Sequence, residues 1–307
     1  QTYLDGEVVE VGYLHHLRFH PKIRGGSFLL RGYKAFRQIF AEQPLKVTFT
    51  SILADNHYAR HLLETTRAAG GMPVYKRVAK FLTALIPLSG PGHRWPERFR
   101  AGHEPEHLTV RNLQHSDISE LRRLFDLAGR HNDGAPVIGE QEFNGGFKFF
   151  PGLAVEDMTG VFDHSGLVAA TGIWNQQQYR QIVVTDLCRP LDILQKIWHQ
   201  TGGFFCKCPV PARGGQVNYA LLDPWAITPG RENELLPVLL KHAVREAKKR
   251  GFMFAAMGMA ENFPGIEALK AVFFMPYWSI IYQVFWPENG SHEFGRRPLH
   301  ISNLGGL

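Results

Sequence analysis

The sequence predicts an α/β (α+β) fold that contains two copies of one unit. Segments with the residue alternation of strands are repeatedly followed by segments whose apolar residues recur at helical spacing. The same landmarks also recur in the same order on both sides of a segment rich in proline and glycine. A length of 307 residues, with 44% hydrophobic and 20% charged residues, is typical of a folded chain of one or two domains.

The first copy is predicted to span residues 1–88. Its helix carries apolar residues on one face, among them Phe28, Tyr33, Phe36 and Phe40. In chain order its elements are a strand ending at Leu17–Pro21, this helix, a strand at Val47–Leu53, the tripeptide Ala54–Asn56, a helix through Leu62 and Leu63, Met72-Pro73, and a strand ending at Pro87.

Residues 89–106 are predicted to be a linker, because their prolines and glycines support neither a helix nor a central strand. The second copy then spans residues 107–307. It opens with a strand at His107–Arg111 and a helix at Ile118–Ala128 capped by Asp117. Its later elements are a strand at Leu167–Ile173, a strand ending at Trp225–Pro229, a helix at Leu235–Ala247, a strand at Phe252–Met257, Ala260–Asn262, Met275-Pro276, and a strand at Trp278–Trp286.

The spacing of these landmarks supports a duplication. Pro21 and Asn56 are 35 residues apart, and Pro229 and Asn262 are 33 residues apart. The copies differ in length, because about 20 residues precede Pro21 whereas about 120 separate His107 from Pro229. We therefore expect the early part of the first copy to be missing, with Gln1 at a fragment edge.

Composition excludes several classes of protein. The net charge of +6 permits an anionic ligand but is too small and dispersed for a nucleic-acid-binding surface. No apolar run reaches the roughly 18 residues of a membrane span. Cys206 and Cys208, with His199 nearby, could ligate a metal, but their spacing is unusual for zinc, so we expect no metal and reduced thiols. Reduced cysteines favour a cytoplasmic protein.

The segment Tyr13–Tyr33 carries the clearest functional pattern. A strand leads into the turn Arg24-Gly25-Gly26-Ser27, and a helix follows. Glycines allow close approach of a ligand, and the amides at a helix N-terminus bind anions. The turn is therefore a candidate pyrophosphate site, although an ordinary glycine-containing turn would have the same sequence.

The run from Leu17 to Gly26 resembles the acetyl-CoA-binding core of the GNAT acetyltransferase superfamily, in which a strand containing proline leads into an Arg-Gly loop. Asn56, followed three residues later by Ala59, resembles the next strand and helix of that family. The resemblance covers nearly the whole chain as tandem modules, each a central mixed sheet flanked by helices. It implies N-acetyltransfer from acetyl-CoA, or another acyl-CoA, to the amine of a small molecule or peptide.

The resemblance also implies the residues that bind the cofactor. The backbone of the strand would pair with the pantetheine arm, the loop would surround the pyrophosphate, and Asn56 would hydrogen-bond the cofactor. These residues are Leu17, Arg18, Phe19, Ile23, Arg24, Gly25, Gly26, Ser27, Phe28 and Asn56.

Departures from the family pattern make catalysis less certain than binding. The family has small residues three and five positions after the arginine, where this chain has Ser27 and Leu29. The position of the tyrosine that serves as the family's general acid is occupied by Leu63. Tyr58 is the candidate acid instead. His16, on the polar face of its strand, is the candidate base, since an imidazole titrates near neutral pH.

The second copy has Pro229-Gly-Arg231-Glu232-Asn in place of the glycine loop, and a carboxylate beside a pyrophosphate would repel it. We expect this loop to be degenerate for cofactor binding, with Arg231 as the one feature that favours binding. Two alternatives to an acyl-CoA-dependent enzyme remain: a non-catalytic module that binds CoA or a metabolite, and a transferase that uses charged tRNA. The sequence specifies neither the acceptor nor an oligomeric state.

Overall fold

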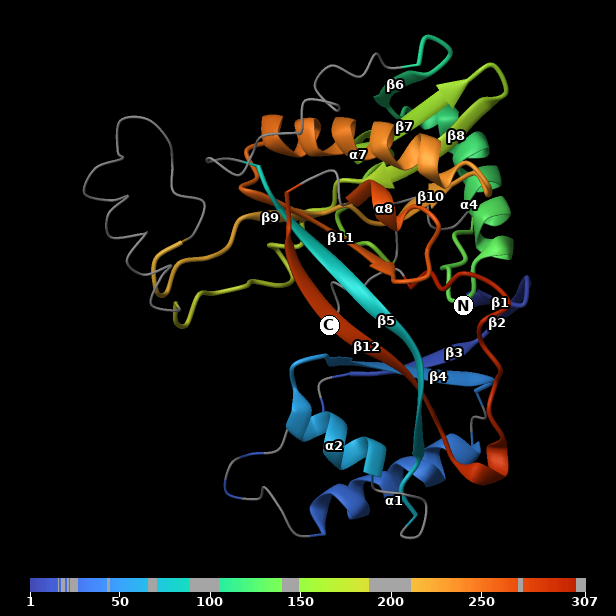
Figure 1. Ribbon diagram of the computed structural model, residues 1–307, viewed down its shortest axis with the longest axis vertical. Helices are drawn as coiled ribbons and strands as arrows, with labels where there is room; N and C mark the ends of the chain where they lie inside the picture. The colour runs from blue at the N-terminus through green and yellow to red at the C-terminus, as the bar shows by residue number, and fades with distance from the viewer. Residues whose placement is uncertain are drawn as a thin grey trace.

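The computed structural model describes residues 1–15, 17, 20, 22, 27–42, 45–65, 71–88, 105–139, 149–187, 211–269 and 273–301. Within them, mixed and antiparallel sheets carry helices on their faces (Figure 1). None of the helices in these ranges is long and apolar enough to cross a membrane. The predicted linker lies outside the described residues except for its last two positions.

The largest sheet has the strand order β3-β4-β12-β5-β11-β9 and contains strands from both copies. Its strands are β3 (Val11–Leu14), β4 (Val47–Leu53), β5 (Val74–Pro87), β9 (Tyr219–Leu221), β11 (Phe254–Ala260) and β12 (Met275–Phe285).

The two long strands β5 and β12 each pair with strands from the other part of the sequence. β12 pairs antiparallel with β4, where Ser279 lies opposite Leu53, and β5 pairs antiparallel with β11, where Phe81 lies opposite Ala260. β5 and β12 also pair with each other, and Figure 1 shows them running side by side through both halves of the molecule. In this sheet β12 therefore separates β4 from β5, and β5 separates β12 from β11.

A second, antiparallel sheet has the order β10-β8-β7-β6 and belongs to the second copy. Helices α4 and α7 pack on it through leucine-rich faces, and Leu121 and Leu239 are fully buried. The elements are β6 (Thr109–Asn112), α4 (Ile118–His131), β7 (Met158–Asp163), β8 (Gly166–Gly172), β10 (Trp225–Ile227), α7 (Glu232–Lys249), α8 (Ile266–Leu269), and short 3₁₀ helices at His115–Asp117, Val155–Asp157 and Pro287–Asn289.

Helices α1 (Phe28–Glu42) and α2 (His57–Thr65) lie at the opposite end of the long strands (Figure 1). They contribute Tyr33, Phe40 and Leu63 to an apolar cluster that also contains Met72 and Trp286. The predicted amphipathic faces therefore become the contact surfaces between helices and sheet.

A hairpin that the sequence analysis did not identify opens the chain. Strands β1 (Thr2–Leu4) and β2 (Glu7–Val9) are joined by Asp5 and Gly6, with φ of 52° and 83°. Both values fit the two-residue turn that Asp-Gly favours. The hairpin packs on α4, where Tyr3 covers Gly129 so closely that a Cβ atom at Gly129 would lie 2.4 Å from its ring.

Two local expectations differ from the structure. β3 ends at Leu14 rather than near Pro21, because its pairing with β4 stops there. Asp117 lies at the start of α4 but does not cap it with its side chain. The carboxylate instead accepts hydrogen bonds from both terminal nitrogens of Arg111 and from the Gln114 N–H, because a guanidinium offers a stronger bond than the helix amides.

Candidate functional site

The candidate site of the first copy lies where β3 and β4 diverge. The two strands pair in parallel over Val11–Leu14 and Val47–Thr50, and β4 continues to Leu53. At the end of the pairing, Thr50 Oγ1 donates to the Leu14 carbonyl at 2.8 Å. Of the residues between Leu14 and Ser27 that the structure describes, which are 15, 17, 20 and 22, none pairs with residues 51–53 of β4.

The glycine loop leads directly into α1. The helix begins at Phe28, which is 45% exposed, and the Ser27 carbonyl accepts the Arg31 N–H at 2.9 Å. The first turn of α1 carries no acidic residue, so its partial positive charge is not offset locally. The other predicted loop and strand residues, His16, Arg18, Phe19, Ile23, Arg24, Gly25 and Gly26, lie outside the described residues.

Asn56 and Tyr58 lie at the start of α2. The Asn56 side-chain oxygen accepts the Ala59 N–H at 3.1 Å, so it caps the helix, which leaves the amide nitrogen to donate to a ligand. Tyr58 is 80% exposed, and Leu17 is 57% exposed. Leu63, at the position of the family's Tyr, is buried in the apolar cluster beneath α1.

His15 directly follows β3. Its ring stacks on Tyr13 with centroids 6.2 Å apart, and the Tyr13 hydroxyl donates to Ser51 Oγ at 2.9 Å. Burial raises the pKa of Tyr13 to about 12, so this phenol stays protonated. The stack places His15 on the face of β4 that carries Ser51.

Sequence reasoning missed Tyr277, which reaches this region because β12 pairs with β4. The Ala54 N–H donates to the Trp278 carbonyl at 2.8 Å, so the start of β12 lies beside the end of β4. Tyr277 is 50% exposed, and its pKa is raised by burial and by the nearby charge of Asp55, while Arg180 opposes the shift. Its position in the second copy gave no local signal of this placement.

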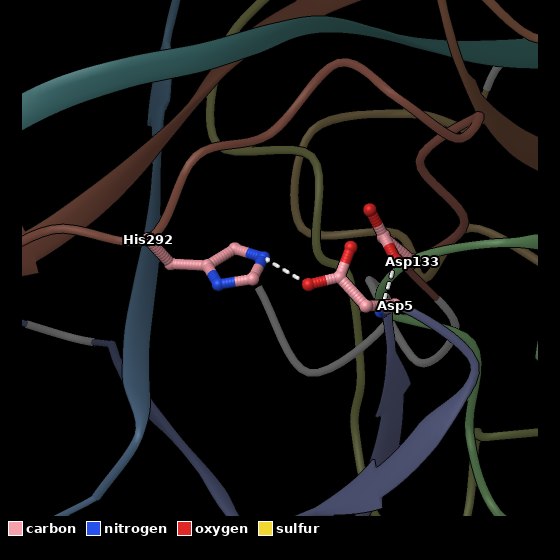
Figure 2. A group of neighbouring side chains, drawn as sticks. All are labelled: Asp5, Asp133 and His292. Atoms are coloured by element: carbon pink, nitrogen blue, oxygen red, sulfur yellow. Dashed lines mark hydrogen bonds and ion pairs between the residues drawn. The ribbon is translucent and has the colours of Figure 1, made fainter.

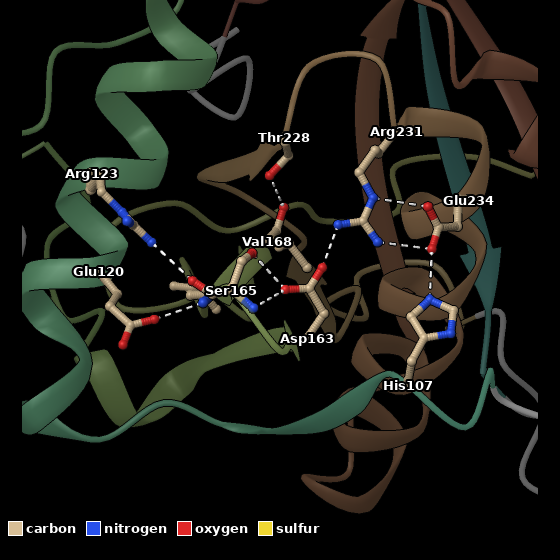
Figure 3. A network of polar contacts seen from close by, with 10 residues as sticks. His107, Glu120, Arg123, Asp163, Ser165, Val168, Thr228, Arg231 and Glu234 are labelled. Carbon is tan, nitrogen blue, oxygen red and sulfur yellow. Dashed lines mark hydrogen bonds and ion pairs between the residues drawn. The ribbon is translucent and has the colours of Figure 1, made fainter.

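The corresponding loop of the second copy is closed by ion pairs (Figure 3). Arg231 donates to Asp163 at 2.5 Å and, through two nitrogens, to Glu234 at 2.9 Å. Asp163 also accepts two hydrogen bonds from Ser165, and these bonds together with Arg231 hold its pKa far below the usual range. Glu234 further contacts His107 at 3.2 Å.

The strand divergence of the second copy is filled by the chain itself. β9 pairs in parallel with β11, whereas β10 leaves that strand to pair with β8. His300 stacks on Trp225 of β10, and Leu299 joins the apolar cluster that contains Ala260 of β11. The side chain of His300 therefore covers Trp225 at the strand that leaves β11.

No protein-family model matches the sequence, and no curated protein sequence matches it either. Among solved structures, a GCN5-related N-acetyltransferase from Sphaerobacter thermophilus aligns with a TM-score of 0.52 at 12% identity, over 86% of this chain and 70% of that one. A tandem GNAT protein from the clavulanic acid biosynthesis pathway gives 0.48 at 12% identity, over 92% and 76%. A GNAT-family acetyltransferase from Colwellia psychrerythraea gives 0.43 at 16% identity, over 92% and 84%. The chain therefore has the fold of the GNAT acetyltransferase superfamily.

Proposed function

We propose that this chain transfers an acetyl or other acyl group from acyl-CoA to an amine of a small molecule or peptide, and that the first copy carries the site. The difference between the two strand divergences supports this proposal most directly. Within residues 1–88 the edge of β4 on the side of β3 has no partner beyond Thr50 among the described residues, whereas the buried imidazole of His300 stacks on Trp225 of the diverging strand β10.

The charges around the two loops favour the same copy for an anionic cofactor. The first turn of α1 has no acidic residue and follows Arg24-Gly25-Gly26. In the second copy the guanidinium of Arg231 is already bonded to two carboxylates. A pyrophosphate would have to displace those carboxylates, so we infer that the second loop is degenerate.

The residues at the first divergence fit acyl-CoA. The end of β4 beyond Thr50, where no described residue of the preceding segment pairs, suits the amides of a pantetheine arm. The loop at 24–27 suits the pyrophosphate, and the Asn56 amide nitrogen is a donor. The bound thioester would supply an acyl carbon open to attack by an amine. Acetyl-CoA is the simplest such donor. The proposal includes the division of the chain into a first domain at residues 1–88, a linker at 89–106 and a second domain at 107–307.

Side chains of this chain would accept the proton of the amine and donate a proton to the leaving thiolate. The amine must lose a proton to a base, for which His16 and its neighbour His15 are candidates. The leaving thiolate needs an acid, for which Tyr58 and Tyr277 are candidates. Tyr277 is favoured because Asp55 and burial keep its phenol protonated.

Calorimetric titration of the full chain with acetyl-CoA tests cofactor binding. Arg24→Glu is expected to abolish binding, because it reverses the charge beside the pyrophosphate. Arg296→Glu makes the same reversal at an exposed position outside the site and should bind as the wild type does. Absence of binding to the wild-type chain would overturn the proposal.

Release of free thiol with a panel of amines tests catalysis separately. Leu63 is buried and apolar where the family has its acidic Tyr, which favours the non-catalytic alternative. Acetyl-CoA binding without thiol release for any amine would select that alternative. Thiol release that requires an amine would reject it.

A further inference from the structure

Three metal-ligating side chains from distant parts of the sequence meet beside the opening hairpin (Figure 2). Asp5 lies in the β1–β2 turn, Asp133 follows α4, and His292 follows β12. One ligating atom from each side chain lies within 4.8 Å of the other two, and His292 Nε2 is 3.6 Å from Asp5 Oδ2. No motif spacing links the three residues, so only the fold brings them together.

The backbone around two of these residues is fixed. Asp5 donates its N–H to Asp133 Oδ1 at 2.9 Å. Asp133 is 2% exposed, its N–H donates to the Pro298 carbonyl at 2.9 Å, and its carbonyl accepts the His300 N–H at 2.8 Å. The two carboxylates are therefore held close together without either being neutralised by the contact.

His292 is oriented just as firmly. The buried Gln283 amide pairs with both backbone groups of His292, accepting its N–H at 2.8 Å and donating to its carbonyl at 3.0 Å. The edge of Phe294 packs against the imidazole with centroids 4.6 Å apart. These contacts aim Nε2 at the carboxylates.

One nitrogen of this cluster lacks a hydrogen bond, and the two carboxylates have too little positive charge around them. Nε2 of His292 is buried and has no hydrogen-bond partner, since 3.6 Å to Asp5 exceeds hydrogen-bond length. Asp133 is buried, and Asp5 places a second carboxylate beside it. A single guanidinium, that of Arg297, can offset only one of the two carboxylate charges.

We propose that Asp5, Asp133 and His292 bind a divalent transition-metal ion. Such an ion would neutralise the carboxylates and accept the Nε2 lone pair, and the exposed Asp5 turn can move inward to complete the contact. Mixed nitrogen and oxygen ligands suit Mn²⁺, Fe²⁺, Co²⁺, Ni²⁺ or Zn²⁺ better than Ca²⁺ or Mg²⁺. The site is separate from the proposed acyltransfer site, and its ligands tie the opening hairpin to α4 and to the segment after β12.

Metal titration of the full chain after chelator treatment tests the proposal. We expect one Mn²⁺ per chain by loss of the free-ion electron paramagnetic resonance signal, with Zn²⁺ competing and Mg²⁺ not. Cys206→Ser with Cys208→Ser removes the thiols that could bind Zn²⁺ elsewhere, and this variant should keep the stoichiometry. A bound ion should also raise the Tm, because it binds only the folded chain.

Two substitutions of the ligands make the test specific. Asp5→Asn keeps a residue that tolerates the positive φ of the turn, and His292→Gln removes the imidazole; each should weaken Mn²⁺ binding at least 10-fold. His164→Ala, in the exposed β7–β8 turn, should leave binding unchanged. Absence of saturable Mn²⁺ binding by the wild type, or binding as tight as that of the wild type in both Asp5→Asn and His292→Gln, would overturn the proposal.

Discussion

His300 lies flat against Trp225, with ring centroids 3.9 Å apart and ring planes 18° apart. The imidazole is buried, and burial lowers its pKa to about 3. An unfolded histidine titrates near 6.5, so between these values the unfolded chain binds a proton that the folded chain does not. The stability that this residue contributes is therefore present above about pH 6.5 and is lost as the pH falls toward 3.

The variant His300→Phe should remove this pH dependence while keeping an aromatic ring against Trp225. Between pH 7 and pH 5 the wild-type chain should lose about 2 kcal/mol more of its free energy of unfolding than the variant. Urea unfolding at both pH values measures the difference, and groups common to the two proteins cancel in it. Equal losses in both would show that His300 titrates normally in the folded chain.

Asp163→Asn should destabilise the second copy by about 3 kcal/mol at pH 7, because it leaves a paired guanidinium without its buried carboxylate. The side chain of Asp163 is 3% exposed. Asp186 pairs with Arg213 at an exposed position, where the side chains are 70% and 67% exposed, so Asp186→Asn should cost much less stability than Asp163→Asn. Denaturant unfolding measures the free energy of unfolding of both variants. Similar losses in Asp163→Asn and Asp186→Asn would contradict a larger contribution from the buried carboxylate.

The stability that Asp163 contributes should depend on pH in the acidic range. The pKa of Asp163 is lowered in the folded chain, so its stabilisation is present above the usual value near 3.9 and is lost as the pH falls below it. The difference between the wild type and Asp163→Asn should therefore shrink below about pH 4. A constant difference from pH 7 to pH 3 would mean that protonation of Asp163 is not involved.

Tyr277→Phe should lower kcat about 100-fold and leave the KM for acyl-CoA nearly unchanged, if Tyr277 supplies the proton to the leaving thiolate. Tyr58→Phe is the matched control, since Tyr58 is 80% exposed and its loss should cost little. Steady-state kinetics of Tyr277→Phe and Tyr58→Phe, with an amine that the wild type acylates, measures both effects. A large effect of Tyr58→Phe with none for Tyr277→Phe would assign the acid to α2.

Cutting the chain within residues 89–106 should leave two halves that do not fold separately. The first half would lack β12 between β4 and β5, and the second would lack β5 between β12 and β11. Circular dichroism and thermal unfolding of each half, alone and co-expressed, give the measurement. Cooperative unfolding of isolated residues 1–88 would contradict this expectation.

Local elements were predictable from the sequence because their signals are local. β4 has the predicted bounds, since Val47–Leu53 is apolar and ends at a turn. Helix α1 begins at the predicted Phe28, directly after the glycines. The expected strand ending at Pro87 is also confirmed, and the strand expected to end at Trp225–Pro229 is β10, which spans Trp225–Ile227.

The contacts between distant segments were not predictable in the same way. Residue periodicity shows which face of β12 is apolar but not that the strand lies beside β4, so the approach of Tyr277 to the end of β4 could not be predicted. The Asp5, Asp133 and His292 group has no spacing that a sequence pattern would reveal. In the second loop the sequence drew attention to Glu232, whereas Glu234 and Asp163 are the residues that hold Arg231.

The pairing of β12 with β4 also bears on how the chain reaches this structure during synthesis. Leu53 pairs with Ser279, so the sheet of the first copy depends on a strand made more than 200 residues later. Contacts so distant in sequence close slowly and leave strand edges exposed meanwhile. During synthesis on the ribosome, the edges of β4 and β5 that pair with β12 stay exposed until β12 has been made. A chaperone that covers these edges should therefore increase the yield of native protein.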